Sequence, residues 1–267
     1  MIQELGHQAW AEYEAQGYLR LGKIINDEQL VTLQQRIDDI MLGEADVDYD
    51  VMTMQRDTET GQYGDLERLS KGFKGSTLNY RKIEQLEFDR EFLNFMQRPL
   101  FREICARVYG VRATIACRRA MFFNKPSRRG TLLPWHQDRW SDFDRDPLVT
   151  LWAALDPATV ANGCVQVIPR SHRALVNPDH GAGFLTERQQ SEIDESKAVN
   201  LEVEAGEVLL LHNWLLHRSD TNRTDVARRA FSVCYMDACT TSKSGKTFSI
   251  IFGPDALNSK GLPGQAV

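Results

Sequence analysis

Two apolar stretches that lie far apart in the chain and end in metal-ligand residues constrain this sequence more than any other feature. Residues 132–138 read Leu-Leu-Pro-Trp-His-Gln-Asp, and residues 209–217 read Leu-Leu-Leu-His-Asn-Trp-Leu-Leu-His. Residues two apart on a β-strand share a face, so His136 and Asp138 can direct an imidazole and a carboxylate to one point. A second histidine from a distant strand would complete a 2-His-1-carboxylate set, which holds ferrous iron and leaves three positions open. We take His217 as that third ligand.

The second half of the chain alternates with the short period of β-strands. Turn signals at Asn162-Gly163 and at residues 205–207 separate several of these segments. The predicted strands are 114–124, 132–140, 148–155, 164–168, 200–203, 207–212 and 229–237. Short strands of this number that close on themselves form a jelly roll, here a cupin-like double-stranded β-helix. We therefore predict a mainly β fold with flanking helices, with a helical excursion at 181–197 near the mouth of the barrel.

The first part of the chain has the longer period of amphipathic helices. Residues 3–16 form one predicted helix, which ends at Gly17 and leads into a short strand at 18–21. A second helix begins at Asn26 and runs to about residue 42, and residues 80–109 return to helix with a break at Arg98-Pro99.

Between these helices, residues 43–79 are polar and irregular with scattered aromatic and methionine side chains. Such a segment is either disordered or a functional lid, and the aromatics favour a lid over the substrate. We divide one predicted domain, 1–267, into a helical part at 1–110, a jelly-roll core at 111–240 and a C-terminal extension at 241–267.

Composition narrows the class of protein. The 267 residues are 42% hydrophobic and 26% charged, which is typical of a globular domain, and the formal net charge is -5. An acidic chain is a poor general nucleic-acid binder, because phosphate binding needs a basic face. The sequence has neither a secretory leader pattern nor an apolar run of membrane-spanning length, so we expect a cytoplasmic protein without a membrane partner. Five cysteines without a CxxC pair are expected to be free thiols.

Further motifs surround the two ligand stretches in a defined order. They are a tryptophan in the strand at 148–155, the Asn162-Gly163 turn, Pro169-Arg170-Ser171-His172, Ser219 and Asn222 after His217, and Arg228, which follows His217 by eleven residues. From about residue 121 to residue 235, this order resembles the phytanoyl-CoA dioxygenase family of Fe(II)- and 2-oxoglutarate-dependent oxygenases. One departure is Arg170, where the family usually has glycine; it affects the backbone of that turn and not the ligands.

The resemblance implies the cofactors and several site residues. Fe(II) would be held by His136, Asp138 and His217, which are then also the catalytic centre, with 2-oxoglutarate as cosubstrate and O2 as oxidant. By resemblance, cosubstrate-binding residues also include Met121, Trp152 and Gln137, the last of them beside the metal, although strand alternation directs Gln137 away from the two ligands that flank it. From the residues alone, Trp152 is equally compatible with plain core packing.

Two adjacent arginines compete for the cosubstrate role. Only one of Arg228 and Arg229 can face into the barrel. If Arg228 does, its face continues with small residues that leave room for a ligand, Ala230, Ser232 and Cys234. A guanidinium suits bidentate binding of the distal carboxylate of 2-oxoglutarate. The eleven-residue spacing of the family favours the same choice.

The carboxylate at 138 distinguishes two reactions within the family. Relatives that halogenate carry a small residue there, so the presence of Asp138 implies oxygen delivery and a hydroxylase. Basic residues near the ligand strand indicate a small, polar, anionic or zwitterionic metabolite as substrate, while tryptophans there suit an alkylammonium group or plain packing. The candidate substrate contacts are Arg119, Trp135, Arg139, Trp140 and Trp214.

Several alternatives stay open at this point. His212 competes with His217, but five residues separate them, and on one regular strand they would face opposite ways. The same site could desaturate or cyclise a substrate in natural-product tailoring, since the outcome depends on the substrate pose. A non-catalytic cupin-like binding protein and a zinc or manganese hydrolase are two further readings. The oligomeric state is not predictable from these patterns.

Overall fold

The N-terminal helices and the first strand form where the sequence predicts them. In the computed structural model, which describes residues 4–262, helix α1 (His7–Gln16) ends at Gly17, whose φ of 84° lies in the left-handed region. Strand β1 (Tyr18–Lys23) follows. The Asn26 side chain accepts a hydrogen bond from the Gln29 backbone N–H and so caps helix α2 (Asp27–Leu42). Residue 3, the predicted start of the first helix, and residues 263–267 of the predicted C-terminal extension lie outside the described residues.

The segment between α2 and the next helix differs from its prediction. Residues 43–79, expected to be irregular, contain strands β2 (Thr53–Arg56) and β3 (Ser70–Lys71), together with a 3-10 turn at Tyr63–Asp65. Residues 80–84, expected to be helical, form strand β4 (Tyr80–Glu84). The cause is non-local, because β4 pairs with β5 (Ile115–Lys125) and β2 pairs with β4. That the segment acts as a lid stays a prediction.

The helices after β4 confirm the predicted break. Helix α3 (Arg90–Met96) begins after Asp89, whose carboxylate accepts from two backbone N–H groups of the first turn. Helix α4 (Pro99–Tyr109) begins with proline at its first position, where the missing N–H has no helical partner to lose. The short helix α5 (Glu187–Ser191) lies in the predicted excursion at 181–197.

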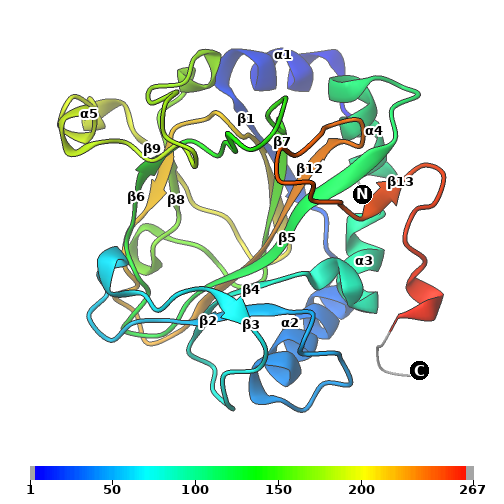
Figure 1. The fold of residues 1–267 in the computed structure, drawn as a ribbon. Helices are drawn as coiled ribbons and strands as arrows, with labels where there is room; N and C mark the ends of the chain where they lie inside the picture. The colour runs from blue at the N-terminus through cyan, green and yellow to red at the C-terminus, as the bar shows by residue number, and fades with distance from the viewer. Residues whose placement is uncertain (1–3, 263–267) are drawn as a thin grey trace.

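Two antiparallel sheets face each other across the molecule (Figure 1). The larger has nine strands in the order β1-β10-β7-β12-β5-β4-β2-β3, with β13 (Ile250–Phe252) paired to β5. Its remaining members are β7 (Val149–Ala154), β10 (Glu207–His212) and β12 (Arg228–Asp237). The smaller sheet has the order β6-β11-β8-β9, formed by β6 (Leu133–His136), β11 (His217–Ser219), β8 (Val165–Val167) and β9 (Val199–Leu201). The arrangement is the predicted jelly roll.

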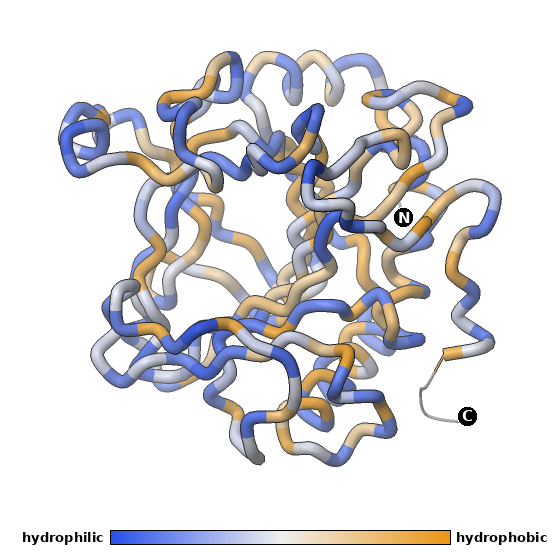
Figure 2. Tube along the Cα trace, viewed as in Figure 1, coloured by the Kyte–Doolittle hydropathy of each residue, from blue (hydrophilic) through white to orange (hydrophobic). Residues whose placement is uncertain are grey.

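The two faces of the large sheet pack against different apolar clusters. Helices α1 to α4 lie along its outer side, where Phe231, Val233 and Tyr235 of β12 join one large apolar cluster with side chains from the helices (Figures 1 and 2). The inner side packs a smaller cluster against the second sheet and includes Ala230. Alternation along one strand therefore separates the helix-covered core from the space between the sheets. Among the described helices, none has the length and apolarity needed to cross a membrane.

Candidate metal centre

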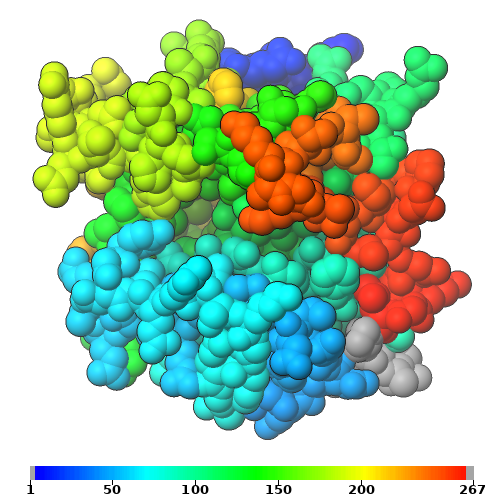
Figure 3. Space-filling view, viewed as in Figure 1, coloured from blue at the N-terminus to red at the C-terminus, as the bar shows by residue number. Residues whose placement is uncertain are grey.

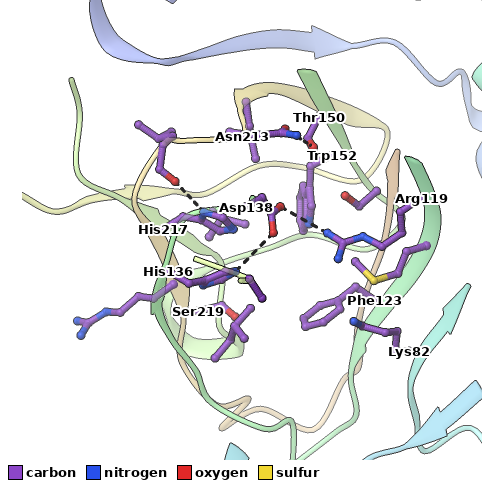
Figure 4. A pocket seen from close by; sticks show the side chains of 18 of the residues that line it. Lys82, Arg119, Phe123, His136, Asp138, Thr150, Trp152, Asn213, His217 and Ser219 are labelled. Carbon is purple, nitrogen blue, oxygen red and sulfur yellow. Dashed lines mark hydrogen bonds and ion pairs between the residues drawn. The ribbon is translucent and has the colours of Figure 1, made fainter. Parts of the chain in front are cut away.

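Strands β6 and β11 bring the three predicted ligands together. His136 and His217 are paired directly opposite each other across the two strands, with ring centroids 4.1 Å apart. Asp138 lies two residues beyond His136, and its Oδ1 is 4.0 Å from His136 Nε2. One ligand atom from each of the three residues lies within 4.8 Å of the other two. Figure 4 shows the three side chains converging at one end of the cavity.

Backbone carbonyls determine which imidazole nitrogens are free. His136 Nδ1 lies 2.9 Å from the carbonyl oxygen of Pro134, and His217 Nδ1 lies 2.8 Å from that of Leu215. A carbonyl oxygen only accepts, so each Nδ1 carries the proton and donates it. Both rings therefore present the lone pair of Nε2 toward the centre, which is the orientation found in histidine metal ligands.

The electrostatics favour the ligating protonation states. Burial, followed by the neighbouring His217, lowers the pKa of His136 to about 3, which keeps that ring neutral. Burial raises the pKa of Asp138, but Arg119 and the two imidazoles outweigh it and hold the pKa at about 2. Arg119 Nη2 lies 3.4 Å from Asp138 Oδ2. The centre thus presents two imidazoles and one carboxylate, a donor set suited to Fe(II).

A cavity of about 260 Å³ opens from the triad. Met121 and Trp152, the expected cosubstrate contacts, are among its lining residues, and Phe184 stacks on His136 with ring centroids 5.0 Å apart and planes 14° apart. In the space-filling view, the surface is hollowed between the cyan segment around 50–80 and the yellow-green segment around 175–195 (Figure 3). Arg119, Arg139 and Trp140, three of the predicted substrate contacts, also line the cavity.

Arg228 faces the same cavity without a partner. Its side chain is 1% exposed, and its Nε and Nη1 donate no hydrogen bond within the described structure. Burial lowers the pKa of Arg228 to about 10, and its guanidinium lies over the rings of Phe123 and Trp152, at 5.7 Å and 5.5 Å from their centroids. Arg229 instead points outward to Asp38 and Asp156. A buried cation with unused donors requires an anion, and a bound dicarboxylate fits this need.

Three predicted site residues do not line the cavity. Gln137 is fully buried and directed away, where its amide donates to the carbonyls of Ala174 and Trp214 and accepts from the Val176 N–H. The placement of Gln137 beside the metal was therefore wrong, and strand alternation gave the correct direction.

The two remaining residues are tryptophans whose indoles pair elsewhere. Trp135 Nε1 donates to Glu195 and its ring packs with Leu185 and Leu216. Trp214 Nε1 donates to Asp146. Each indole is thus turned into the protein around the site, and a substrate contact by either tryptophan stays a prediction.

Sequence reasoning missed several residues that line the cavity. They are Tyr63, Arg81, Lys82 and Phe184, and His212, which was considered only as a rival to His217, lines it too. His212 ends β10, and a turn separates it from β11, so it and His217 do not share one strand as assumed. For Arg81 and Lys82, the sequence offered one local indication, the basic pair itself, and it lay in a stretch that resembled a helix.

The fold, the triad and the unpaired arginine define a class of protein, the jelly-roll oxygenases that use Fe(II) and 2-oxoglutarate. The family model of phytanoyl-CoA dioxygenase (PhyH) matches residues 13–230. The chain therefore belongs to the phytanoyl-CoA dioxygenase family and is a non-haem iron dioxygenase with Fe(II) and 2-oxoglutarate as its cofactor and cosubstrate.

Curated relatives and solved structures agree with this assignment. The phytanoyl-CoA dioxygenase of Arabidopsis thaliana is 23% identical over 256 residues, covering 86% of this chain and 89% of the relative. Phytanoyl-CoA dioxygenase domain-containing protein 1 of Rattus norvegicus is 26% identical over 268 residues, with the same coverage of 86% and 89%. The structure of EctD from S. alaskensis with 2-oxoglutarate and 5-hydroxyectoine has a TM-score of 0.69 at 18% identity, covering 97% of this chain and 82% of that one.

Proposed function

We propose that this enzyme hydroxylates a small polar metabolite that carries an anionic group, alone or as part of a zwitterion. The coproducts are succinate and CO2. His136, Asp138 and His217 hold Fe(II), and Arg228 binds the distal carboxylate of 2-oxoglutarate. When bound, the iron with 2-oxoglutarate and O2 supplies the oxidising chemistry that converts a substrate C–H bond to C–OH.

The observation that supports an anionic substrate is the charge of the residues that line the cavity. Arg81, Lys82, Arg119 and Arg139 line the cavity, whereas among residues 4–262 the triad carboxylate Asp138 is the only acid that lines it. Three of them already have a carboxylate partner: Arg119 has Asp138, Lys82 has Glu84 at 3.5 Å and Arg139 has Asp146 at 3.9 Å. Arg81 has no such partner among residues 4–262, and an unpaired cation in a largely buried space favours ligands with negative charge, because an unpaired buried charge is costly.

The protein's own residues position and protect the reacting groups. The carbonyls of Pro134 and Leu215 orient the two imidazoles, and the carbonyl of Asn213 accepts the Asp138 N–H at 2.7 Å, which fixes the start of the loop that carries the carboxylate. The ring of Phe184 covers His136 and excludes water from that side. The carboxylate occupies the position that a halide would need, which supports oxygen transfer.

Anaerobic titration of the metal-free protein with Fe(II) and then 2-oxoglutarate tests the site. We expect one equivalent of each to bind and a visible charge-transfer band to appear. We expect His136→Ala to lose both the binding and the band, with Arg188→Gln on the surface as the unaffected control. Absence of the band in the wild type would contradict the assignment of the ligands.

Succinate release across a panel of metabolites then tests the substrate class. We expect stimulation by small anionic or zwitterionic compounds and a product heavier than the substrate by one oxygen atom. A response confined to long-chain acyl thioesters would refute the proposed substrate class, and a product lighter by two hydrogens would show desaturation or cyclisation instead.

A further inference from the structure

An irregularity in strand β4 turns Arg81 into the cavity. Gln55 of β2 pairs with Lys82, but the next residue, Arg56, pairs with Tyr80, so Arg81 is an extra residue on β4. Tyr80 and Ile83 consequently share the helix-covered core although they are three residues apart, while the adjacent Arg81 and Lys82 both line the cavity. Bulges of this kind redirect a side chain that regular alternation would place on the other face.

The surroundings of Arg81 hold its guanidinium in place but leave its charge unpaired. The side chain is 4% exposed, and Nη1 donates to the Gln55 side-chain oxygen at 3.0 Å. The guanidinium carbon lies 5.5 Å from the centroid of the Tyr63 ring and 4.8 Å from that of Phe123. Its Nε has no hydrogen-bond partner, and across residues 4–262 no carboxylate lies within ion-pair distance of it.

Burying such a cation is unfavourable unless an anion joins it. Burial lowers the pKa of Arg81, with Tyr63 and Asp57 opposing that effect more weakly. Arginine nevertheless stays charged at neutral pH, so the guanidinium and its unused donor are destabilising unless an anion pairs with them. Gln55 and Tyr63 both come from the segment at 43–79, which therefore helps to fix this side chain.

The cosubstrate leaves this cation without a partner. 2-Oxoglutarate has two carboxylates, one beside its keto group, which would bind the metal, and a distal one, which the proposed function assigns to Arg228. Both arginines lie over the ring of Phe123, Arg228 at 5.7 Å and Arg81 at 4.8 Å from its centroid. An anion for Arg81 must accordingly come from another molecule in the cavity.

We propose that Arg81 is a specificity-determining residue that binds an oxyanion of the substrate, a carboxylate or a phosphonate, through its free donor. This inference rests on the proposed function and names the residue that selects its substrate. Tyr63 covers the guanidinium and contacts Phe184 with ring centroids 5.4 Å apart, and Phe184 in turn stacks on the metal ligand His136. The oxyanion site and the iron ligands thus share one continuous wall, so an anchored substrate is held in a defined pose relative to the metal.

Calorimetric titration of acetate and of methylphosphonate tests this inference without a known substrate. The protein is held anaerobically with Fe(II) and 2-oxoglutarate. We expect Arg81→Gln to weaken binding of at least one probe by about tenfold or more, while the affinity for 2-oxoglutarate changes by less than about threefold. Arg188→Gln, which removes an exposed arginine of α5, is the matched control and should change neither.

The outcomes separate this inference from the proposed function. If the wild type forms the charge-transfer band but binds neither probe, or binds both as tightly after Arg81→Gln, the oxyanion site is refuted while the iron site stands. Loss of 2-oxoglutarate binding with retained probe binding would assign Arg81 to the cosubstrate instead. Arg81→Lys keeps the charge in the folded protein and should retain part of the probe affinity, which a purely structural role would not require. Absence of the band in the wild type would refute the proposed function itself.

Discussion

Replacing Arg228 by methionine should stabilise the cofactor-free protein while it removes cosubstrate binding. The pKa of Arg228 falls to about 10 because the guanidinium is buried. One pKa unit corresponds to about 1.4 kcal/mol, so the fold disfavours this charge by roughly 3 kcal/mol. Contacts with the rings of Phe123 and Trp152 return part of that cost, about 1–2 kcal/mol together. We therefore expect Arg228→Met to raise the free energy of unfolding by about 1–2 kcal/mol.

The pH dependence of this gain follows from the direction of the shift. The folded pKa lies below the unfolded one, so the arginine is charged in both states below about pH 10 and the penalty is present in full there. The stability difference between variant and wild type should consequently be constant from about pH 6 to about pH 9 and shrink only above about pH 10. Urea denaturation of the metal-free proteins measures it.

The adjacent arginine provides a matched control of opposite sign. Arg229 pairs with Asp38 at 2.7 Å and with Asp156 at 2.8 Å, so Arg229→Met leaves two carboxylates unpaired and should lose about 2 kcal/mol or more. Arg228→Met should also weaken 2-oxoglutarate binding by about 100-fold or more, whereas Arg229→Met should retain it. If both variants lose similar stability, Arg228 has a structural counter-ion role and the reasoning is wrong.

Three further outcomes are expected. Asp89→Ala should lower the free energy of unfolding by about 3–5 kcal/mol, because it leaves Arg36 buried without its partner at 2.7 Å; a loss below about 1 kcal/mol in urea denaturation would contradict this. Burial raises the pKa of Glu87 to about 7, so the free energy of unfolding of the wild type should fall as the pH rises from about 4.5 through about 7. Glu87→Gln should remove that pH dependence, and equal slopes for the two proteins would disprove the assignment. Phe184→Ala should weaken Fe(II) binding by up to about tenfold, because the stacked ring no longer fixes His136, with Phe184→Leu closer to the wild type in the same titration.

Strand alternation explains how much of the site was predictable from the sequence. It placed His136 and Asp138 together and required that only one of Arg228 and Arg229 face the barrel. The family spacing favoured Arg228, and the structure agrees with both placements. For Gln137, alternation and family resemblance pointed in opposite directions, and alternation was correct. The parity of a strand is a local property, so it can be read wherever the strand is regular.

The residues that sequence reasoning missed depend on long-range pairing. Strand β4 is a strand because it joins β5, and its stretch of sequence has the apolar spacing of a helix. The bulge that exposes Arg81 to the cavity arises from the register with β2, which the local sequence does not encode. Phe184 reaches His136 through an isolated bridge between an excursion and β6, and no spacing rule relates these two positions.

The two faces of β12 have separate roles, one packing against the helices and the other bordering the cavity. Phe231, Val233 and Tyr235 anchor the helices on one side, whereas Ser232, between them, borders the cavity on the other. A mutation that reshapes the cavity therefore leaves most of the stabilising hydrophobic contacts intact. Substitutions on the cavity face of β12 can thus alter substrate selection while the packing of the helices on its other face is kept.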